Sequence, residues 1–106
     1  MGLFSFLNSP DINEGINEFN KTQNAVLLDV RTEDEYRGGH IEGSINIPLQ
    51  KIQNVSEIIK DKNTPLFVFC YSGARSGQAV SYLSKIGYTN VKNIGGISQY
   101  RGKIAV

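Results

Sequence analysis

Two short segments of this chain, AVLLDV (residues 25–30) and PLFVFC (residues 65–70), are apolar on both sets of alternating positions. A strand with one solvated face alternates apolar and polar residues instead. A short run without that alternation is typical of a strand covered on both faces, as in a parallel sheet between layers of helices. The two segments therefore predict central, parallel, fully buried strands.

Helical patterns separate these strands. Asp11 and Glu14 predict a capping box before a first helix, and Thr32 and Glu35 predict another before a short helix. Apolar residues at helical spacing mark the first helix and two later ones, over residues 51–60 and from about 73 to 86: Ile12, Ile16, Phe19; Ile52, Val55, Ile58, Ile59; Ala79, Val80, Leu83, Ile86. Gly87 suits the position just after the last helix.

Two further segments, SINIP (44–48) and VKNIGG (91–96), are expected to be shorter strands. Strands and helices thus alternate along the whole chain. That order indicates the α/β class, with a mainly parallel sheet.

The length and charge of the chain indicate one globular domain over residues 1–106, in which residues 1–10 form an N-terminal extension. Hydrophobic residues make up 40% and charged residues 20%, and 11 basic against 10 acidic residues leave a formal charge of +1. This balance favours neither a nucleic-acid nor a membrane partner. We expect a monomer.

The N-terminal segment MGLFSFLNSP lacks the basic start and the long apolar stretch of a signal peptide. Its apolar side chains are expected to pack on the domain itself: Leu3, Phe4, Phe6 and Leu7. The single cysteine cannot form an internal disulfide, and with His40 as the only histidine we expect no metal and no cofactor. A reducing, cytoplasmic compartment fits this cysteine usage.

The cysteine itself, Cys70, ends the second buried strand and lies just before the last long helix. Sites in open α/β sheets form at the carboxyl ends of strands. The following residues are candidates for an anion-binding loop whose backbone N–H groups point inward: Tyr71, Ser72, Gly73, Ala74, Arg75 and Ser76. The helix dipole and the positive charge of Arg75 act in the same direction.

These features predict that the pKa of the Cys70 thiol lies well below the ~8.5 of free cysteine. The thiolate would then act as the catalytic nucleophile without a separate base. The alternative is an inert core cysteine, which would have apolar neighbours at mid-strand. Cys70 is followed instead by Tyr71, Ser72 and Gly73.

Three segments, in this order, resemble the rhodanese-like domains: LLDVRTEDEYRGGHIEGSINIP (27–48), CYSGARS (70–76) and NIGGISQY (93–100). Tyr100 stands where many members have tryptophan. The resemblance runs from about Ile12 to Arg101. It implies a five-stranded, mainly parallel sheet with helices on both faces and with Cys70 at the bottom of a shallow pocket.

The resemblance also implies a chemistry. Cys70 would take sulfane sulfur from thiosulfate or a persulfide donor and pass it, as a persulfide, to a thiophilic acceptor. A sulfur-relay protein is a further candidate partner. The alternative from another class is a non-catalytic persulfide carrier or partner-binding regulatory module.

A cysteine-dependent phosphatase or arsenate reductase is disfavoured by loop length. Such phosphatases use Cys-x5-Arg, usually after a histidine, whereas this chain has Cys-x4-Arg from Cys70 to Arg75, after Phe69. Asp29 and Arg31 are candidates for a supporting role, in which the carboxylate would orient the loop or Arg75. An ordinary ion pair is the alternative for both.

His40 belongs to the first signature, where the resemblance suggests a structural role near a turn. A Cys–His hydrolase would need this histidine beside Cys70. We therefore expect His40 to be held by backbone contacts.

Overall fold

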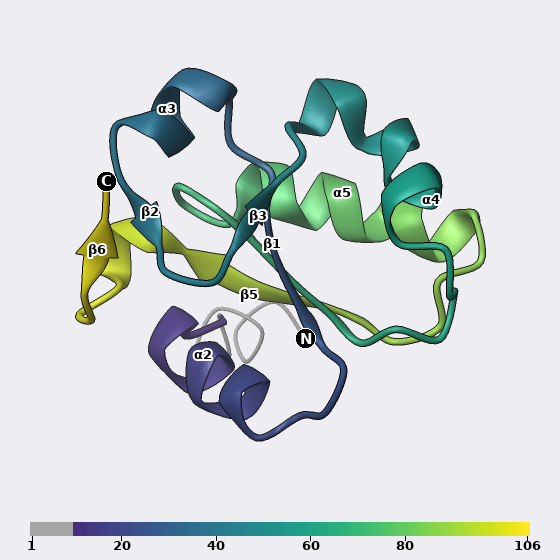
Figure 1. Cartoon of the computed structure of the whole chain (residues 1–106), viewed down its shortest axis with the longest axis horizontal. Coiled ribbons are helices and arrows are strands. Elements are labelled where there is room, and N and C mark those ends of the chain that lie inside the picture. The colour runs from purple at the N-terminus through teal and green to yellow at the C-terminus, as the bar shows by residue number, and fades with distance from the viewer. Residues whose placement is uncertain (1–9) are drawn as a thin grey trace, which may run out of the picture.

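The fold is described here from a computed structural model, which describes residues 10–106. Four parallel strands form the main sheet, with β3 (Ile45–Asn46), β1 (Val26–Asp29), β4 (Leu66–Cys70) and β5 (Val91–Gly96) side by side in that order (Figure 1). The central pair, β1 and β4, are the two runs without alternation, and they pair from Val26–Leu66 to Asp29–Phe69. The prediction of buried parallel strands is confirmed.

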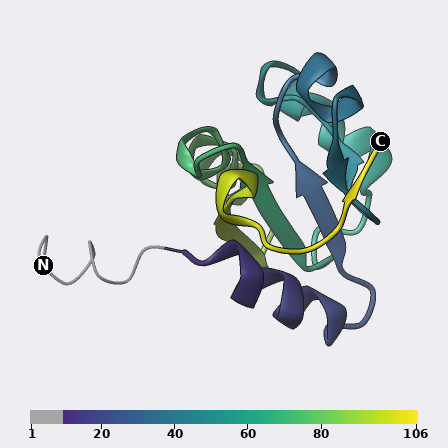
Figure 2. The ribbon, with the colours of Figure 1, turned by 90° about the vertical axis from the view of Figure 1, so that its left-hand side faces the viewer.

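Helices cover both faces of this sheet. On one side lies α2 (Ile12–Asn20), and on the other lie η1 (Leu49–Asn54), α4 (Val55–Ile58) and α5 (Ala74–Lys85) (Figures 1 and 2). Successive residues of β4 enter the two cores in turn: Val68 and Cys70 pack in the cluster with Leu83 of α5, while Phe67 and Phe69 pack in the cluster with Ile12 of α2. Apolar residues at every position of β4 are therefore required by two cores.

The fold class is confirmed, but within residues 10–106 the main sheet has four strands rather than five. Two more strands, β2 (His40–Ile41) and β6 (Ile104–Ala105), form a separate antiparallel pair. Gly39, at a φ of 150°, turns the chain into β2 directly after α3 (Glu33–Arg37), where it meets the returning C-terminal segment. Each partner has two residues, which is too short for a periodic signal in the sequence.

The helix ends follow the predicted caps with one change. At α3, Thr32 N donates to Glu35 Oε1 at 2.9 Å and Glu35 N donates to Thr32 Oγ1 at 3.2 Å, so this capping box is confirmed. At α2, Asp11 Oδ1 accepts from Asn13 N at 2.9 Å rather than from Glu14. Gly87 follows α5 at a φ of 106°, a left-handed conformation that glycine adopts without strain.

Residues 51–60 are largely helical, as predicted, but the face of the helix that is buried differs from the prediction. Lys51, at φ −115°, interrupts η1, and only one turn of α-helix follows it. Ile52, Val55 and Ile59 are buried as expected, whereas Ile58 is 58% exposed. A tighter 3₁₀ turn and a kink shift the helical period by part of a turn, so Ile58 points outward while Ile59 is buried.

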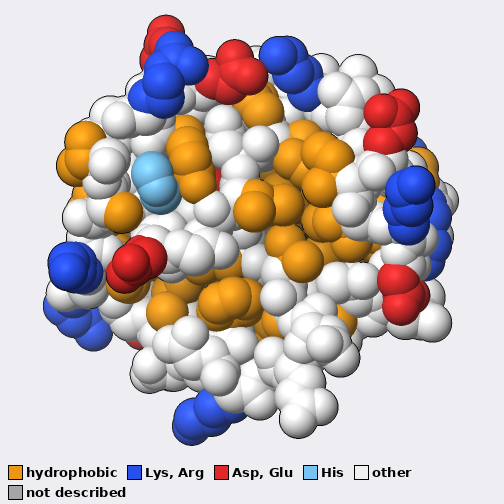
Figure 3. Space-filling model, viewed as in Figure 1, with side chains coloured by type: hydrophobic (Ala, Val, Ile, Leu, Met, Phe, Trp, Pro, Cys, Tyr) orange, Lys and Arg blue, Asp and Glu red, His pale blue; other side chains and the backbone are white. Residues whose placement is uncertain are grey.

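The surface seen in Figure 3 carries side chains of both charges around its edge and apolar side chains nearer its centre. No basic patch dominates this face, in keeping with the formal charge of +1. Within residues 10–106, no helix has the length and apolar character needed to cross a membrane. The expected packing of Leu3, Phe4, Phe6 and Leu7 lies outside the described residues.

Candidate active site

Cys70 is the last residue of β4, and the loop that follows encloses its side chain. The residue is 0% exposed. Its Sγ accepts hydrogen bonds from Gly73 N at 3.0 Å, from Ser76 N at 3.4 Å and from Ser76 Oγ at 3.4 Å. Donors that converge on one atom form a site for negative charge, here on sulfur.

Two glycines let the loop close around the sulfur. Gly73 has a φ of 103°, and its carbonyl accepts from Gly77 N at 3.1 Å as α5 begins. Gly96, at the end of β5, lies so close to the loop that a Cβ there would be 2.1 Å from Tyr71 O. The same carbonyl accepts from Ser98 N at 3.1 Å. Backbone contacts from the end of β5 and from the residues just after it therefore support the loop.

The thiol of Cys70 is shifted toward its charged form. Burial raises the pKa of this thiol, but hydrogen bonds from the Ser76 hydroxyl, from Ser76 N and from the N–H groups of Gly73 and Ser72 outweigh burial and hold the pKa below its ordinary value. A buried cysteine among apolar groups alone would shift in the opposite direction. The predicted direction is the one that the structure shows.

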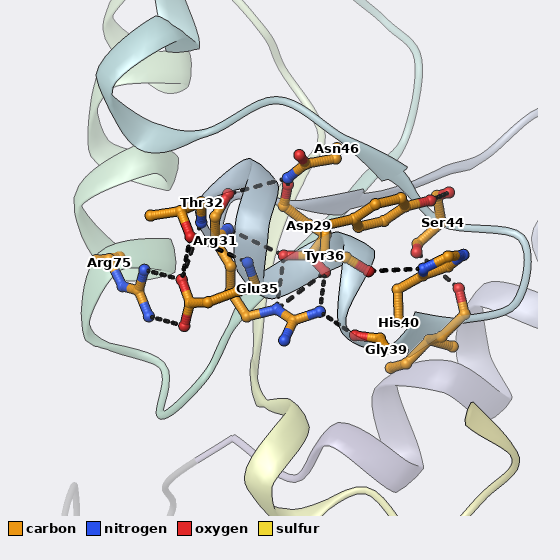
Figure 4. A network of polar contacts seen from close by, with 11 residues as sticks. Asp29, Arg31, Thr32, Glu35, Tyr36, Gly39, His40, Ser44, Asn46 and Arg75 are labelled. Carbon is orange, nitrogen blue, oxygen red and sulfur yellow. Dashed lines mark hydrogen bonds and ion pairs between the residues drawn. The ribbon is translucent and has the colours of Figure 1, made fainter. Parts of the chain in front are cut away.

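Arg75 does not present a free cation to the loop. Its guanidinium forms a two-pronged ion pair with Glu35 of α3, at 2.8 Å from Nη1 to Oε1 and 3.1 Å from Nη2 to Oε2 (Figure 4). The hydrogen bond from Arg75, helped by those from Thr32, lowers the pKa of Glu35 to about 2. The expected positive charge is thus present but largely neutralised, because Glu35 caps α3 and reaches across to α5.

The comparisons with known proteins agree with this arrangement. The family model of the rhodanese-like domain matches residues 13–103. The chain is a rhodanese-like domain. It is 42% identical over 71 residues to the thiosulfate sulfurtransferase PspE of Escherichia coli K12, covering 66% of this chain and 68% of that protein.

Two further relatives support the same family. The chain is 40% identical over 76 residues to a sulfurtransferase of Allochromatium vinosum, covering 71% of this chain and 69% of that protein. Among solved structures, a rhodanese with anions from E. coli superposes with a TM-score of 0.71 at 36% identity, covering 76% of this chain and 96% of that one.

In this rhodanese-like domain, Asp29 and Arg31 form a buried ion pair with each other. Arg31 Nη2 lies 2.8 Å from Asp29 Oδ2, and the side chains are 7% and 0% exposed. Arg31 also donates to Gly39 O at 2.8 Å, and Asn46 Nδ2 donates to the carbonyls of Asp29 and Arg31 at 2.9 Å each. This is the ordinary ion pair among the two alternatives, and it ties β1 to the turn that precedes β2.

His40 is held by a backbone contact, as expected, and also by an aromatic ring, which was not predicted. Its Nδ1 lies 2.9 Å from Tyr36 O, and the imidazole stacks on the Tyr36 ring with centroids 3.9 Å apart and an interplanar angle of 7° (Figure 4). Tyr36 in turn bonds to the carbonyl of Ser44. These contacts occupy His40 within the α3–β2 segment, so they give it the structural role.

Sequence reasoning missed Asn93. It lies on β5, where a bulge makes Val68 pair with Asn93 and Phe69 pair with Gly95. Asn93 Nδ2 donates to Gly73 O at 3.1 Å, and Oδ1 accepts from Ser76 Oγ at 2.8 Å. The signal in the sequence is a polar amide in a short strand, closely followed by two glycines, a pattern typical of a bulge beside a site.

The shallow pocket implied by the resemblance is absent from residues 10–106. No pocket opens there, and the loop together with the adjoining core covers Cys70. Among the same residues, no cluster of three or more His, Cys, Asp or Glu side chains is placed to hold a metal ion.

Proposed function

We propose that this rhodanese-like domain is a sulfurtransferase that moves sulfane sulfur through a persulfide on Cys70. The observation that carries the proposal is the convergence of Gly73 N, Ser76 N and Ser76 Oγ on Sγ. The names of the relatives, thiosulfate sulfurtransferase and sulfurtransferase, support the same chemistry.

In the first half-reaction, the Cys70 thiolate attacks the outer sulfur of thiosulfate. A bond forms between Sγ and that sulfur, the S–S bond within thiosulfate breaks, and sulfite leaves with the electron pair. Sγ loses its charge as the new bond forms, sulfite carries the displaced electron pair away, and the outer sulfur keeps its negative charge as the terminal sulfur of the persulfide anion. Backbone N–H groups of the loop are suited to hold that charge, since they already point at Sγ.

In the second half-reaction, a thiophilic acceptor attacks the terminal sulfur of the persulfide. Its electron pair forms the new bond, the Sγ–S bond breaks, and the electrons return to Sγ as a thiolate. With cyanide as the acceptor, the product is thiocyanate. The donors around Sγ stabilise the leaving thiolate, so the same loop serves both halves of the cycle.

The proposed donor is a small anion such as thiosulfate, or a persulfide brought by a sulfur-relay protein. No broad charged face is seen in Figure 3 to attract a large polyanion. A thiolate that must stay reduced fits the cytoplasm, which we propose as the compartment.

Intact mass measurement tests this function. After incubation with thiosulfate, the protein should gain the mass of one sulfur atom, and cyanide should remove it. The Cys70→Ser variant is the control, because it keeps the loop and lacks the nucleophile. A native, reduced and folded protein that gains no sulfur from either thiosulfate or a low-molecular-weight persulfide would overturn the proposal.

A persulfide carrier is the second candidate, favoured by the full enclosure of Cys70. An enclosed persulfide is protected from small thiols until a partner protein opens the loop. Turnover separates the two candidates: an enzyme produces thiocyanate catalytically from thiosulfate and cyanide, whereas a carrier accepts one sulfur and stops.

A further inference from the structure

The hydroxyl of Ser76 lies between two acceptors and has one proton to give. Ser76 is 0% exposed, so no water competes for that proton. Its Oγ is 2.8 Å from Asn93 Oδ1 and 3.4 Å from Cys70 Sγ. A hydroxyl rotates about its C–O bond, so the proton can point to either acceptor but not to both.

The amide of Asn93 is fixed in orientation by its other contacts. Its Nδ2 donates to Gly73 O at 3.1 Å, and its Oδ1 accepts from Gly95 N at 3.0 Å. Turning the amide over would place N–H against N–H and oxygen against oxygen, so the network assigns Oδ1 to the Ser76 side. Asn93 is therefore a permanent acceptor for the hydroxyl and a clamp on the loop at Gly73.

We propose that Asn93 is a positioning residue for sulfur transfer: it holds the Ser76 hydroxyl proton while Sγ is uncharged and yields it when charge appears on Sγ. The inference rests on the proposed function. Sγ is charged before attack on the donor, is uncharged in the persulfide, where the charge lies on the terminal sulfur, and regains its charge when the acceptor removes that sulfur. The Ser76 hydroxyl can point either to Asn93 Oδ1 or to Sγ. It can therefore turn toward Sγ whenever that atom is charged, and its proton stays on the hydroxyl oxygen throughout.

The charged groups around the loop do not take part in this exchange. They are Arg75 on α5 with its partner Glu35 on α3, and the buried pair of Asp29 and Arg31 at the end of β1. All four are already engaged in ion pairs. Among the donors that bond to Sγ, the Ser76 hydroxyl is the one whose direction can change.

The test is a double-mutant cycle on the ionisation of Cys70, followed by the ultraviolet absorbance of its thiolate against pH. The chain has one cysteine, so subtraction of the Cys70→Ser spectrum isolates that signal. Ser76→Ala should lower the ionisation constant of Cys70 by about tenfold, because a hydrogen bond to a charged sulfur is lost. This tenfold change is the reference with which the effects of Ser76→Ala in the Asn93 variants are compared.

Two substitutions at Asn93 should couple to Ser76 with opposite signs. Asn93→Asp keeps acceptor oxygens but is charged, so it attracts the hydroxyl proton more strongly. In that background, Ser76→Ala should lower the ionisation constant of Cys70 by a smaller factor than in the native protein. Asn93→Ala removes the competing acceptor. In that background, Ser76→Ala should lower the ionisation constant of Cys70 by a larger factor than in the native protein. Direct repulsion between the introduced carboxylate and the thiolate is present with or without the hydroxyl and cancels in the cycle.

Matched controls separate this coupling from general effects. Asn90→Asp adds the same charge at an exposed position just before β5, and Ser81→Ala removes an exposed hydroxyl on α5. Neither should couple to the ionisation of Cys70. Circular dichroism confirms that each variant is folded, and either substitution at Asn93 suffices for a cycle if the other fails to fold.

Additive effects of the Ser76 and Asn93 substitutions would overturn the inference and reduce Asn93 to a structural clamp. The proposed function is tested apart from this, by the mass gain of the native protein with thiosulfate. Sulfur uptake without coupling contradicts only the role of Asn93. Coupling without sulfur uptake contradicts the sulfurtransferase proposal and leaves the role of Asn93 toward the thiolate standing.

Discussion

At the scale of single residues, Cys70 shows how a buried side chain can stay reactive. Removal from water opposes the thiolate, and hydrogen bonds from Ser76, Gly73 and Ser72 outweigh that effect. Glu35 and Arg75 show a related balance, since each neutralises the other's charge beside the loop. The environment of the site is therefore set by hydrogen bonds and paired charges rather than by one free cation.

The pair of Glu35 and Arg75 predicts a pH-dependent stability. The pKa of Glu35 falls from 4.5 to about 2 on folding, so its stabilisation is fully present above pH 4.5 and is lost as the pH falls toward 2. Because both side chains are about one third exposed, screening reduces the contribution to about 1 kcal/mol. Urea unfolding at several pH values should show Glu35→Gln less stable than native at pH 7 and equal to it near pH 2. A constant difference across this range would contradict the assignment.

At the scale of elements, the loop between β4 and α5 is shaped by its contact with β5. Gly96 lets the two backbones approach, and the bulge in β5 brings Asn93 to the loop at Gly73. The length of the loop then decides how many N–H groups surround the reacting atom. The close approach and the ring of N–H groups therefore depend on how the loop packs against β5, and neither element produces them alone.

Close approach at Gly96 predicts a sharp cost for a single methyl group. Gly96→Ala would place Cβ 2.1 Å from Tyr71 O, so the loop must shift. We expect a loss of about 1–3 kcal/mol in the free energy of unfolding and a loss of sulfur uptake. Gly38→Ala is the matched control, since its Cβ would meet only ordinary contacts at 3.5 Å. Equal effects of the two substitutions would contradict the close-approach argument.

Loop length predicts selectivity for sulfur over phosphorus. The Cys-x4-Arg loop is one residue shorter than a Cys-x5-Arg phosphatase loop, so it offers fewer N–H groups than the oxygens of a phosphoryl group require. Aryl phosphate hydrolysis should not exceed background, and a glycine inserted between Gly73 and Ala74 should impair sulfur uptake. Aryl phosphate cleavage by the native protein that Cys70→Ser abolishes would show that the loop-size argument is wrong.

At the scale of the whole molecule, the parallel sheet brings the ends of distant segments to one edge. Asp29, Asn46, Cys70 and Gly96 end their strands side by side, and helices on the two faces hold the strands in place. The core that contains Cys70 is shared with α5 through Ala79 and Leu83. Helix α5 therefore contributes both to the stability of the core and to the geometry of the site.

A substitution in this core far from Cys70 should change the free energy of unfolding without changing the pKa of the thiol. Leu83 is 0% exposed in the last turns of α5, so Leu83→Ala should cost about 2–5 kcal/mol in urea unfolding. The pKa of Cys70 should stay unchanged in the folded variant, because its donors lie at the other end of the helix. Ile58→Ala, at a position 58% exposed, is the control and should cost little. A shift of the Cys70 pKa in Leu83→Ala would show that the whole helix, and not its first turn, tunes the thiol.

The sequence by itself determined what depends on neighbours along the chain. Apolar runs predicted β1 and β4, Thr32 and Glu35 predicted the cap of α3, and the position of Cys70 before a helix predicted a stabilised thiolate. Only the tertiary structure decided that Glu35 neutralises Arg75, that Asn93 shares the Ser76 hydroxyl with Cys70, that β2 pairs with β6, and that the loop leaves no open pocket within residues 10–106. The reason is physical: periodicity and capping involve residues within one or two turns, whereas these contacts join groups from separate elements whose distances are set by packing.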